Sequence, residues 1–456
     1  MADTGSHPQL SADTAAMRIQ SVHRGRAVRK YIDSRMGAAD PRGGVHANLR
    51  HGKPGDAAAR EYEAPAEGSL AAAYKHAAEA AGRKANYLVV RSLLESAEMG
   101  TDSFFVDAPG CHATTFTSRL GDPDIAVFMQ AFGARAPLLT RLDLSRGLLT
   151  DDGARQLAEG LLGPQAEQLQ SLSLCANSIG PLGCTAVCRA LQPCPRLQHL
   201  DLSRNPLGRA GGLAVVELIK VSVPLQELLI ADAELDIDVL VAVAAALHVG
   251  GARLCVCDLG NPRIGTLQEE HTVHLGRMLR VDTHLVEIRL GKHRMRDEGV
   301  RQLVSFLIEN KTLRVLDLRC NELGADGAKH LGTLLSDDCQ LSLLDLSGNR
   351  IGEKCNVEGA RALAQALTCN RMLRALDLNS NMLCDGALQL LADALDRNST
   401  LETVALFHNQ WDQPSSYKFH QILGDRRRIL PLRADFVTSR VDLRIDICKV
   451  DGFQLK

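Results

Sequence analysis

A short cluster of acidic and histidine residues is the part of this sequence that comes nearest to a metal-binding motif. Glu270, His271 and His274 stand in the order E-H-x-x-H, and carboxylate and imidazole groups are frequent zinc ligands. A helical H-E-x-x-H motif places two histidines one turn apart, so that both can bind one ion. The order here differs, and we therefore predict ordinary surface residues rather than a metal site.

Other reactive residue types do not fall into catalytic patterns. Cys255 and Cys257 lack cysteine or histidine partners at the spacing of a zinc site. The sequence contains no G-x-x-x-x-G-K-[ST] phosphate loop, no G-x-G-x-x-G and no G-x-S-x-G nucleophile elbow. We therefore predict a protein without enzymatic activity, cofactor or bound metal.

Six aspartates share one repeated position, directly between two apolar residues. They are Asp143, Asp201, Asp258, Asp317, Asp345 and Asp377. In a strand this alternation points the carboxylates to the face opposite their apolar neighbours. Adjacent carboxylates repel, so each must be hydrated or paired with a cation. Arg204 follows Asp201 by three residues, and Arg319 follows Asp317 by two. We predict an acidic surface that binds a basic segment of a partner protein. The alternative is that these charges only keep the surface soluble.

The N-terminal region contains a strongly basic segment. The net charge of the chain is −2, but residues 17–35 alone carry +5, which leaves −7 for the remainder. With Asp13 or Thr14 as N-cap and Gly37 as the stop, a helix is predicted over 13–36. Ile19, Val22 and Ile32 are apolar positions on a helix otherwise rich in arginine, a pattern typical of helices that bind a partner groove.

This segment resembles the IQ motif at each defining position. The matching residues are Ile19, Gln20, Arg24, Gly25, Arg29 and Ile32. The resemblance implies binding to calmodulin or a related EF-hand protein, often without calcium. Gln20 can exchange hydrogen bonds with backbone, Arg24 and Arg29 can face an acidic rim, and Gly25 permits close approach. The alternative is a basic helix that binds microtubules, nucleic acid or acidic lipid. We favour the EF-hand partner, and predict no nucleic-acid or membrane partner.

The elements that position the aspartates come from a repeat of about 28 residues. Its core is L-x-x-L-x-L or a close variant, and it begins at Leu139, Leu169, Leu197, Leu225, Leu254, Leu285, Leu313, Leu341, Leu373 and Leu401. Successive starts are 28 to 32 residues apart. Each core alternates like a short strand and is followed by a helical pattern, as in 327–335 and 386–395. Such units bury their apolar faces only by stacking.

An asparagine follows the last core position by three residues in most repeats. The six are Asn177, Asn205, Asn321, Asn349, Asn381 and Asn409. A buried amide there can satisfy backbone groups that turn inside the stack. Gly147, Ala233, Pro262 and His293 stand at this point in the other repeats, so their turns are less well defined by the sequence.

The period, the helix in every repeat and the G-A-x-x-L helix opening resemble the ribonuclease-inhibitor type of leucine-rich repeat. The resemblance covers 139–409 and implies an α/β leucine-rich-repeat solenoid, a horseshoe with parallel inner strands and outer helices. Ten strands would line an arc of roughly 45–50 Å. Such a concave face suits a protein partner better than a small molecule.

The domain organisation follows from changes in composition along the chain. We expect disorder over 1–12, the IQ helix over 13–36 and a Gly/Pro-rich flexible linker over 37–60. A helical N-terminal cap is predicted over 61–138, with one helix opened by Ser69 and another with Tyr87, Val90, Leu94 and Ala97 on one stripe. The ten repeats occupy 139–410, and a C-terminal cap and tail 411–456, with a helix that includes Trp411, Tyr417, Phe419 and Leu423.

Cysteine usage and hydropathy bear on the compartment. Thirteen cysteines include no C-x-x-C pair, and many, such as Cys175, Cys257, Cys320 and Cys384, fall at repeat positions. We expect buried free thiols in a reducing cytoplasm. No apolar run reaches the length of a membrane span, and no secretory segment follows Met1.

Together these features predict a non-enzymatic scaffold, with an unidentified protein on the concave face and an EF-hand protein on the IQ helix. The tail, with a Trp just past the last repeat Asn, resembles that of ciliary and germ-cell leucine-rich-repeat proteins. We therefore expect a cytoskeletal location, in a cilium or flagellum axoneme. The alternative is a GTPase-activating protein of the Ran type, for which Arg141 or Arg146 would be the local candidates. A fragment of an innate-immune receptor is a third class, but the sequence lacks a nucleotide-binding motif.

Overall fold

The computed structural model describes residues 66–99, 103–110, 119–162, 166–221, 224–249, 253–265, 269–281, 284–424, 432–441 and 444–450. The segments predicted as disordered (1–12), IQ helix (13–36) and linker (37–60) lie outside the described residues. Arg426, Arg427 and Arg428 also lie outside them.

One twelve-stranded sheet runs through the described chain with its strands in sequence order from β1 to β12. Every neighbouring pair is parallel, as in β2–β3 and β8–β9. Ten strands coincide with the predicted repeat cores: β2 (Leu139–Asp143), β3 (Ser171–Ser173), β4 (His199–Asp201), β5 (Glu227–Leu229), β6 (Val256–Asp258), β7 (Glu287–Arg289), β8 (Val315–Asp317), β9 (Leu343–Asp345), β10 (Ala375–Asp377) and β11 (Thr403–Ala405). The edge strands are β1 (Phe104–Asp107) and β12 (Arg433–Ala434).

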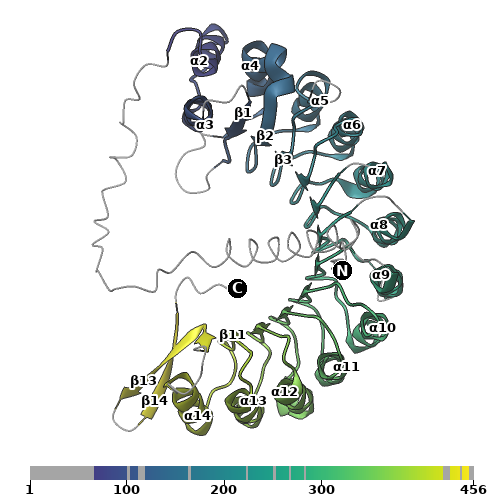
Figure 1. Ribbon diagram of the computed structural model, residues 1–456, viewed down its shortest axis with the longest axis vertical. Coiled ribbons are helices and arrows are strands. Elements are labelled where there is room, and N and C mark those ends of the chain that lie inside the picture. The colour runs from purple at the N-terminus through teal and green to yellow at the C-terminus, as the bar shows by residue number, and fades with distance from the viewer. Residues whose placement is uncertain are drawn as a thin grey trace, which may run out of the picture.

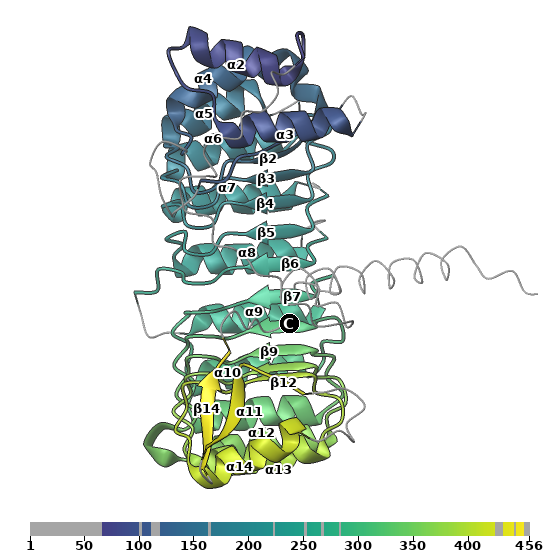
Figure 2. The ribbon, with the colours of Figure 1, turned by 90° about the vertical axis from the view of Figure 1, so that its left-hand side faces the viewer.

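A helix follows each of the strands β2 to β10 and lies on the outer side of the arc (Figure 1). These helices are α5 (Asp151–Gly160), α6 (Pro181–Leu191), α7 (Gly208–Lys220), α8 (Ile237–Val249), α9 (Glu270–Val281), α10 (Asp297–Leu307), α11 (Ala325–Ser336), α12 (Glu358–Cys369) and α13 (Asp385–Arg397). The strands stack along the concave side (Figure 2). The predicted fold, a leucine-rich-repeat solenoid with inner strands and outer helices, is confirmed.

The core is the space between the sheet and the helices. Leu142, Leu172, Leu200 and their counterparts point into it and are at most 1% exposed. On the helix side the apolar face packs against them; Leu331 and Leu335 of α11, for example, are buried. Because each repeat contacts the next, these side chains form one continuous cluster from the first repeat to the last.

The turn asparagines connect neighbouring repeats as predicted. Asn205 Nδ2 donates to the carbonyl oxygens of Leu202 in its own repeat (3.0 Å) and Leu174 in the preceding one (2.9 Å). Its Oδ1 accepts from the Ile179 amide at 3.1 Å. Asn177, Asn321, Asn349, Asn381 and Asn409 also donate to a carbonyl of the preceding repeat. One side chain therefore satisfies backbone groups of two repeats that no ladder bond reaches.

The N-terminal cap combines two helices with the edge strand. Ser69 caps α2 (Leu70–Ala80), and Asn86 caps α3 (Tyr87–Glu98). α4 (Asp122–Phe132) and a 3-10 helix, η3 (Gly133–Leu138), precede β2. The buried rings of Tyr74, Phe128 and Phe132 lie 5.3–5.8 Å apart and join α2 to α4.

Two details of the predicted N-terminal cap differ. β1 lies in the stretch 104–139, for which an irregular capping repeat is expected but no strand is specified, and it pairs with β2. The stripe on α3 was also misplaced, because Tyr87 is 52% exposed whereas Val89 and Leu93 are buried.

The C-terminal cap contains α14 (Gln413–Gly424), β12, and an antiparallel pair formed by β13 (Phe436–Val441) and β14 (Arg444–Lys449). The Trp411 ring lies 5.2 Å from Phe419 and 4.8 Å from Phe436. The prediction of a final amphipathic helix is correct for Phe419, but Trp411 precedes α14 and only packs against it. Tyr417 was wrongly included in its buried face, since it is 55% exposed.

Candidate protein-binding surface

The predicted aspartates lie in one row across the concave face of the sheet. In register from β1 to β11 the row reads Asp107, Asp143, Ser173, Asp201, Leu229, Asp258, Arg289, Asp317, Asp345, Asp377 and Ala405. Other side chains separate Asp143, Asp201 and Asp258 from one another. Asp317, Asp345 and Asp377 stand on three adjacent strands, and we call these three residues the acidic ladder.

Each of the six aspartates performs the same local task. One carboxylate oxygen accepts a hydrogen bond from the amide two residues later, at 2.8–3.0 Å, as in Ser145 to Asp143 and Asn379 to Asp377. These bonds hold the turn that leaves each strand. This local role explains the frequency of the L-D-L pattern without any partner, while the second oxygen is left for other contacts.

Crowding and burial change the acidity of the acidic ladder. Burial first, and then the neighbouring carboxylate of Asp345, raise the pKa of Asp377 to about 8. The same two causes raise the pKa of Asp317 to about 6. Strands in a sheet lie about 4.8 Å apart, so these three carboxylates in register, of which Asp317 and Asp377 are buried, repel one another. Cations that approach this part of the face would relieve the repulsion.

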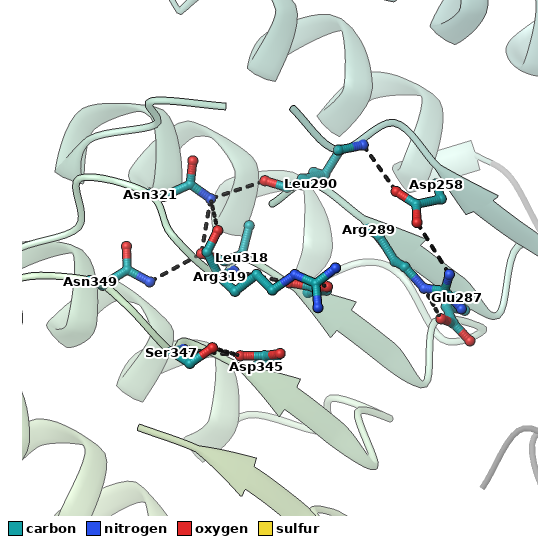
Figure 3. A network of polar contacts seen from close by, with 12 residues as sticks. Asp258, Glu287, Arg289, Leu290, Leu318, Arg319, Asn321, Asp345, Ser347 and Asn349 are labelled. Carbon is teal, nitrogen blue, oxygen red and sulfur yellow. Dashed lines mark hydrogen bonds and ion pairs between the residues drawn. The ribbon is translucent and has the colours of Figure 1, made fainter. Parts of the chain in front are cut away.

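The Arg289 guanidinium balances negative charge of the neighbouring carboxylates on the concave face. The sequence analysis did not identify this residue. Its Nε donates to Glu287 Oε1 at 2.5 Å, and its Nη1 donates to Asp258 Oδ2 at 3.2 Å (Figure 3). All three side chains are at most 12% exposed. The Glu-Ile-Arg order of β7, which puts two opposite charges on one strand face, was the signal available in the sequence.

The two predicted arginine partners behave differently. Arg319 lies 3.3 Å from Asp317 of its own repeat. Arg204 instead lies 3.9 Å from Asp232 of the next repeat, so the expected pairing with Asp201 is wrong. Arg204 has a positive φ of 58°, which is a turn conformation, and from that turn its side chain reaches Asp232 instead.

A second row lies beside the acidic ladder, two residues earlier on each strand. Val315, Leu343 and Ala375 are in register on β8, β9 and β10. They form a buried cluster separate from the core and are 1%, 6% and 1% exposed. We call them the apolar row. Strand alternation places the apolar row and the acidic ladder on the same face.

At the N-terminal end the same row position is polar. The His199 ring contacts Glu227 at 2.9 Å, and Arg141 lies beside Asp107 and over the Phe105 ring. Arg141, a candidate under the Ran-type alternative, is therefore exposed and forms a surface ion pair with Asp107. Arg146, the other candidate, occupies a positive-φ turn.

The histidine cluster does not form a metal site. Glu270 and His274 are exposed, but His271 is 1% exposed, so its prediction as a surface residue is wrong. The His271 ring instead packs 5.4 Å from His293. Within the described ranges no group of three or more His, Cys, Asp or Glu residues is arranged to hold a metal ion.

The cysteines and the six residues of the IQ match complete the predicted sites. The residues of the IQ match, Ile19, Gln20, Arg24, Gly25, Arg29 and Ile32, lie outside the described residues.

The described cysteines are free thiols. Cys257 and Cys384 are buried, but Cys320 is exposed, contrary to the expectation of burial. The part of the chain that the structure describes holds no helix with the length and apolar content needed to cross a bilayer.

Comparison with known proteins agrees with the repeat architecture. A family model described as "Leucine Rich repeat" matches residues 194–216 and 309–332. Pig (Sus scrofa) ribonuclease inhibitor is 27% identical over 291 residues, 63% of this chain and 50% of that protein. Rat (Rattus norvegicus) leucine-rich repeat-containing protein 34 is 31% identical over 195 residues, 43% of this chain and 46% of that protein. The chain thus spans about half the length of these curated relatives.

Solved structures among the matches include an actin-binding site of leiomodin-1 and a tropomodulin C-terminal domain from Caenorhabditis elegans. Both are 16% identical to this chain, with TM-scores of 0.25 and 0.29. They cover 40% and 36% of this chain, and 84% and 92% of their own chains. The repeat pattern and the parallel sheet agree with these matches that the chain contains leucine-rich repeats folded as an α/β solenoid.

Proposed function

We propose that this chain is a non-enzymatic scaffold that binds a basic protein segment on its concave face and an EF-hand protein, such as calmodulin, through residues 13–36. The observation that carries the proposal is the concave face itself. There the acidic ladder and the apolar row lie side by side on three adjacent strands. A basic partner segment complements the charge of the acidic ladder.

Neutralising the acidic ladder tests the concave site. In the triple variant Asp317→Asn, Asp345→Asn, Asp377→Asn, each amide oxygen can still accept the bond from the turn while the charge is lost. When each chain is used as bait in ciliated-cell extract, the wild-type chain should capture a partner protein that the triple variant does not capture. The matched control changes three exposed aspartates of the outer helices, Asp152→Asn, Asp238→Asn and Asp396→Asn. Loss of the same partner with both triple variants would count against the concave site.

Calorimetry with calmodulin tests the second site on the full chain. We expect micromolar or tighter binding, which corresponds to about −8 kcal/mol. The double variant Ile19→Ala, Arg24→Ala should abolish the heat, because it removes an apolar anchor and a cation. Ile230→Ala, a core substitution far from this segment in the sequence, controls for general destabilisation. An absence of heat with the wild-type chain, with and without calcium, would refute this part of the proposal.

A cytoskeletal location is part of the same proposal and rests on the tail resemblance and on the IQ match. A fluorescently tagged full chain in ciliated cells should accumulate at the axoneme or basal body. Uniform distribution through the cell would contradict this placement while leaving both binding sites untouched. The Ran-type alternative is not favoured, because that family ends in a strongly acidic tail whereas this sequence has Arg426, Arg427 and Arg428 in the corresponding region.

A further inference from the structure

A cavity of about 530 Å³ opens at the C-terminal end of the array, apart from the acidic ladder. It lies where the turn after β11 (407–409), the start of α14 and strand β14 come together (Figure 1). Its volume falls within the range of roughly 300–1,000 Å³ that is usual for ligand pockets. The side chains on its wall indicate which chemical group it can bind.

Aromatic and aliphatic carbon atoms form one part of this wall. Trp411 lines the cavity, and its ring packs against Phe419 and Phe436, with centroids 5.2 and 4.8 Å away. The indole nitrogen of Trp411 is buried although the residue as a whole is only half-buried, so the side-chain surface that it presents is ring carbon. Phe407 and Ile447 add further apolar surface.

One carboxylate lies among these apolar groups. Asp412 lines the cavity just before α14, and its Oδ1 accepts the Ser415 amide at 2.8 Å. Its Oδ2 has no hydrogen-bond partner or ion-pair partner among the described residues. The described residues that line the cavity include no lysine or arginine. A second carboxylate, that of Asp435, accepts the Phe407 amide at 3.2 Å and so lies behind the same wall. The two carboxylates favour a cation in the cavity.

The combination of aromatic carbon and a carboxylate suits arginine in particular. A planar guanidinium can stack on aromatic rings while its N–H groups donate to a carboxylate. A lysine ammonium is more strongly hydrated, so it loses more on entering a wall that is largely apolar. A neutral apolar ligand would cover the Asp412 carboxylate without providing a hydrogen-bond donor, which is unfavourable.

We propose that this cavity binds an arginine side chain of the basic partner segment, with the guanidinium against the Trp411 and Phe407 rings and its N–H groups on Asp412. This inference deepens the proposed function and rests on it in one respect, because it takes the ligand to be part of that partner. The cavity and the acidic ladder consist of different residues, so each can be tested without the other.

The fluorescence of Trp411 tests the cavity directly. Trp411 is the single tryptophan of the chain, so its emission reports on this wall alone. Titration of the full chain with Nα-acetyl-arginine-N-methylamide should give a saturable change in that emission. The corresponding citrulline derivative has nearly the same shape but no charge, and it should bind about ten-fold more weakly. The lysine derivative should also bind more weakly than the arginine derivative.

Two substitutions separate the charge from the aromatic wall. Asp412→Asn keeps an oxygen for the Ser415 amide but removes the charge, and it should weaken binding of the arginine derivative about ten-fold. Asp396→Asn, an exposed change on α13, should leave the affinity unchanged. Phe407→Leu keeps an apolar side chain but removes a ring, and it should weaken binding about two- to five-fold. Thermal unfolding checks that each variant remains folded.

The outcomes distinguish this inference from the proposed function. Equal affinity for the citrulline derivative, or an unchanged affinity in Asp412→Asn, would overturn the arginine site. So would the absence of both a fluorescence change and a saturation-transfer NMR signal from the arginine derivative. If the arginine derivative binds but no captured protein depends on the acidic ladder, the proposed concave site fails and the cavity stands. The reverse pair of results would retain the concave site and remove this cavity from the partner's binding surface.

Discussion

The aspartates of the inner sheet stabilise the backbone before they contact any partner. In every one of the six repeats concerned, a carboxylate oxygen accepts a turn amide at 2.8–3.0 Å. The hydrogen bond requires an oxygen but no charge. At Asp317 and Asp377 the charge is costly, because burial and a neighbouring carboxylate oppose ionisation.

Asp377→Asn should therefore stabilise the protein at alkaline pH. The pKa of Asp377 is about 8 in the folded chain, against an ordinary value of 3.8. The folded state binds the proton more tightly, so its stability falls as pH rises from about 4 to 8. We expect the variant to exceed wild type by about 1–3 kcal/mol at pH 8 and by less at pH 5.5. Urea unfolding measures both values, and the exposed Asp396→Asn serves as the control. A gain that is the same at both pH values would contradict the reasoning.

His293 is a second residue whose chemistry is set by burial. It stands where most repeats have the turn asparagine, and its Nε2 lies 3.0 Å from the Leu259 carbonyl oxygen. Burial lowers the pKa of His293 to about 3 and that of His271 to about 4. Both imidazoles are therefore neutral in the folded protein at neutral pH.

His293→Asn should make the protein less sensitive to acid. An unfolded histidine gains a proton near pH 6.5, whereas these two do not gain one while folded, so stability falls as pH drops below 6.5. At pH 5 each histidine contributes a loss of up to about 2 kcal/mol. The variant should lose only about half as much stability between pH 7.5 and pH 5 as wild type, measured by urea unfolding. The exposed His274→Asn, on the same helix as His271, should behave like wild type. An unchanged loss in the variant would show that this buried pair does not control acid stability.

At the scale of the element, buried asparagines close both ends of the repeat unit. The turn asparagines were predicted, but a second set was not. Asn310, Asn370 and Asn398 stand three residues before a core leucine and donate to a carbonyl at the end of a preceding helix. Their Oδ1 atoms accept amides at the start of the following core, at 2.8 Å for Leu313, Leu373 and Leu401. The pattern N-x-x-L that marks these asparagines is present in the sequence. It was not recognised because the asparagine precedes the L-x-x-L-x-L core from which the strands were predicted.

Asn370→Ala should cost about 2–4 kcal/mol of stability. Nδ2 donates to Leu335 O at 2.8 Å, and Oδ1 accepts from the amides of Met372 and Leu373. The substitution leaves these buried backbone groups without their partner, which costs about 1–3 kcal/mol for each unsatisfied group. Chemical unfolding measures the change. Gln365→Ala, on the exposed side of α12, should change stability by less than about 0.5 kcal/mol. Similar effects of the two substitutions would refute this role for Asn370.

The sequence pattern predicts repeated elements well and cross-repeat contacts poorly. Leu142, Leu172 and Leu200 recur with the repeat, so their burial follows from the period alone. The Arg289 ion pair joins residues 31 apart, and no local pattern indicates which charge meets which across two strands. β1 was missed because its Phe-Phe-Val-Asp segment lacks the repeat phrase and becomes a strand only by pairing with β2. Tyr87 was misplaced by one position, which moves a helical residue by about 100°.

For the molecule as a whole, the parallel sheet has two edges that must be covered. At the N-terminal end, β1, α2, α3 and α4 cover the first repeat. At the C-terminal end, Asp435 accepts the amides of Leu406 and Phe407 at 2.9 and 3.2 Å. Phe436 adds a buried ring that contacts Trp411 and Phe419. Unpaired strand edges invite association with other chains, and these caps protect them.

Phe436→Ala should open the C-terminal end and leave the N-terminal end intact. Phe436 is 1% exposed, and loss of a buried phenylalanine typically costs about 3–5 kcal/mol. Because each repeat contacts only its neighbours, that cost falls first on α14, β11 and α13 and decreases along the array. Amide hydrogen exchange should show faster exchange in 373–424 and unchanged exchange in 139–202. Tyr417→Ala, which removes an exposed ring from α14, should alter neither region. Equal loss of protection at both ends would mean that the array unfolds as one cooperative unit, so that a partner on the concave face would stabilise every repeat equally.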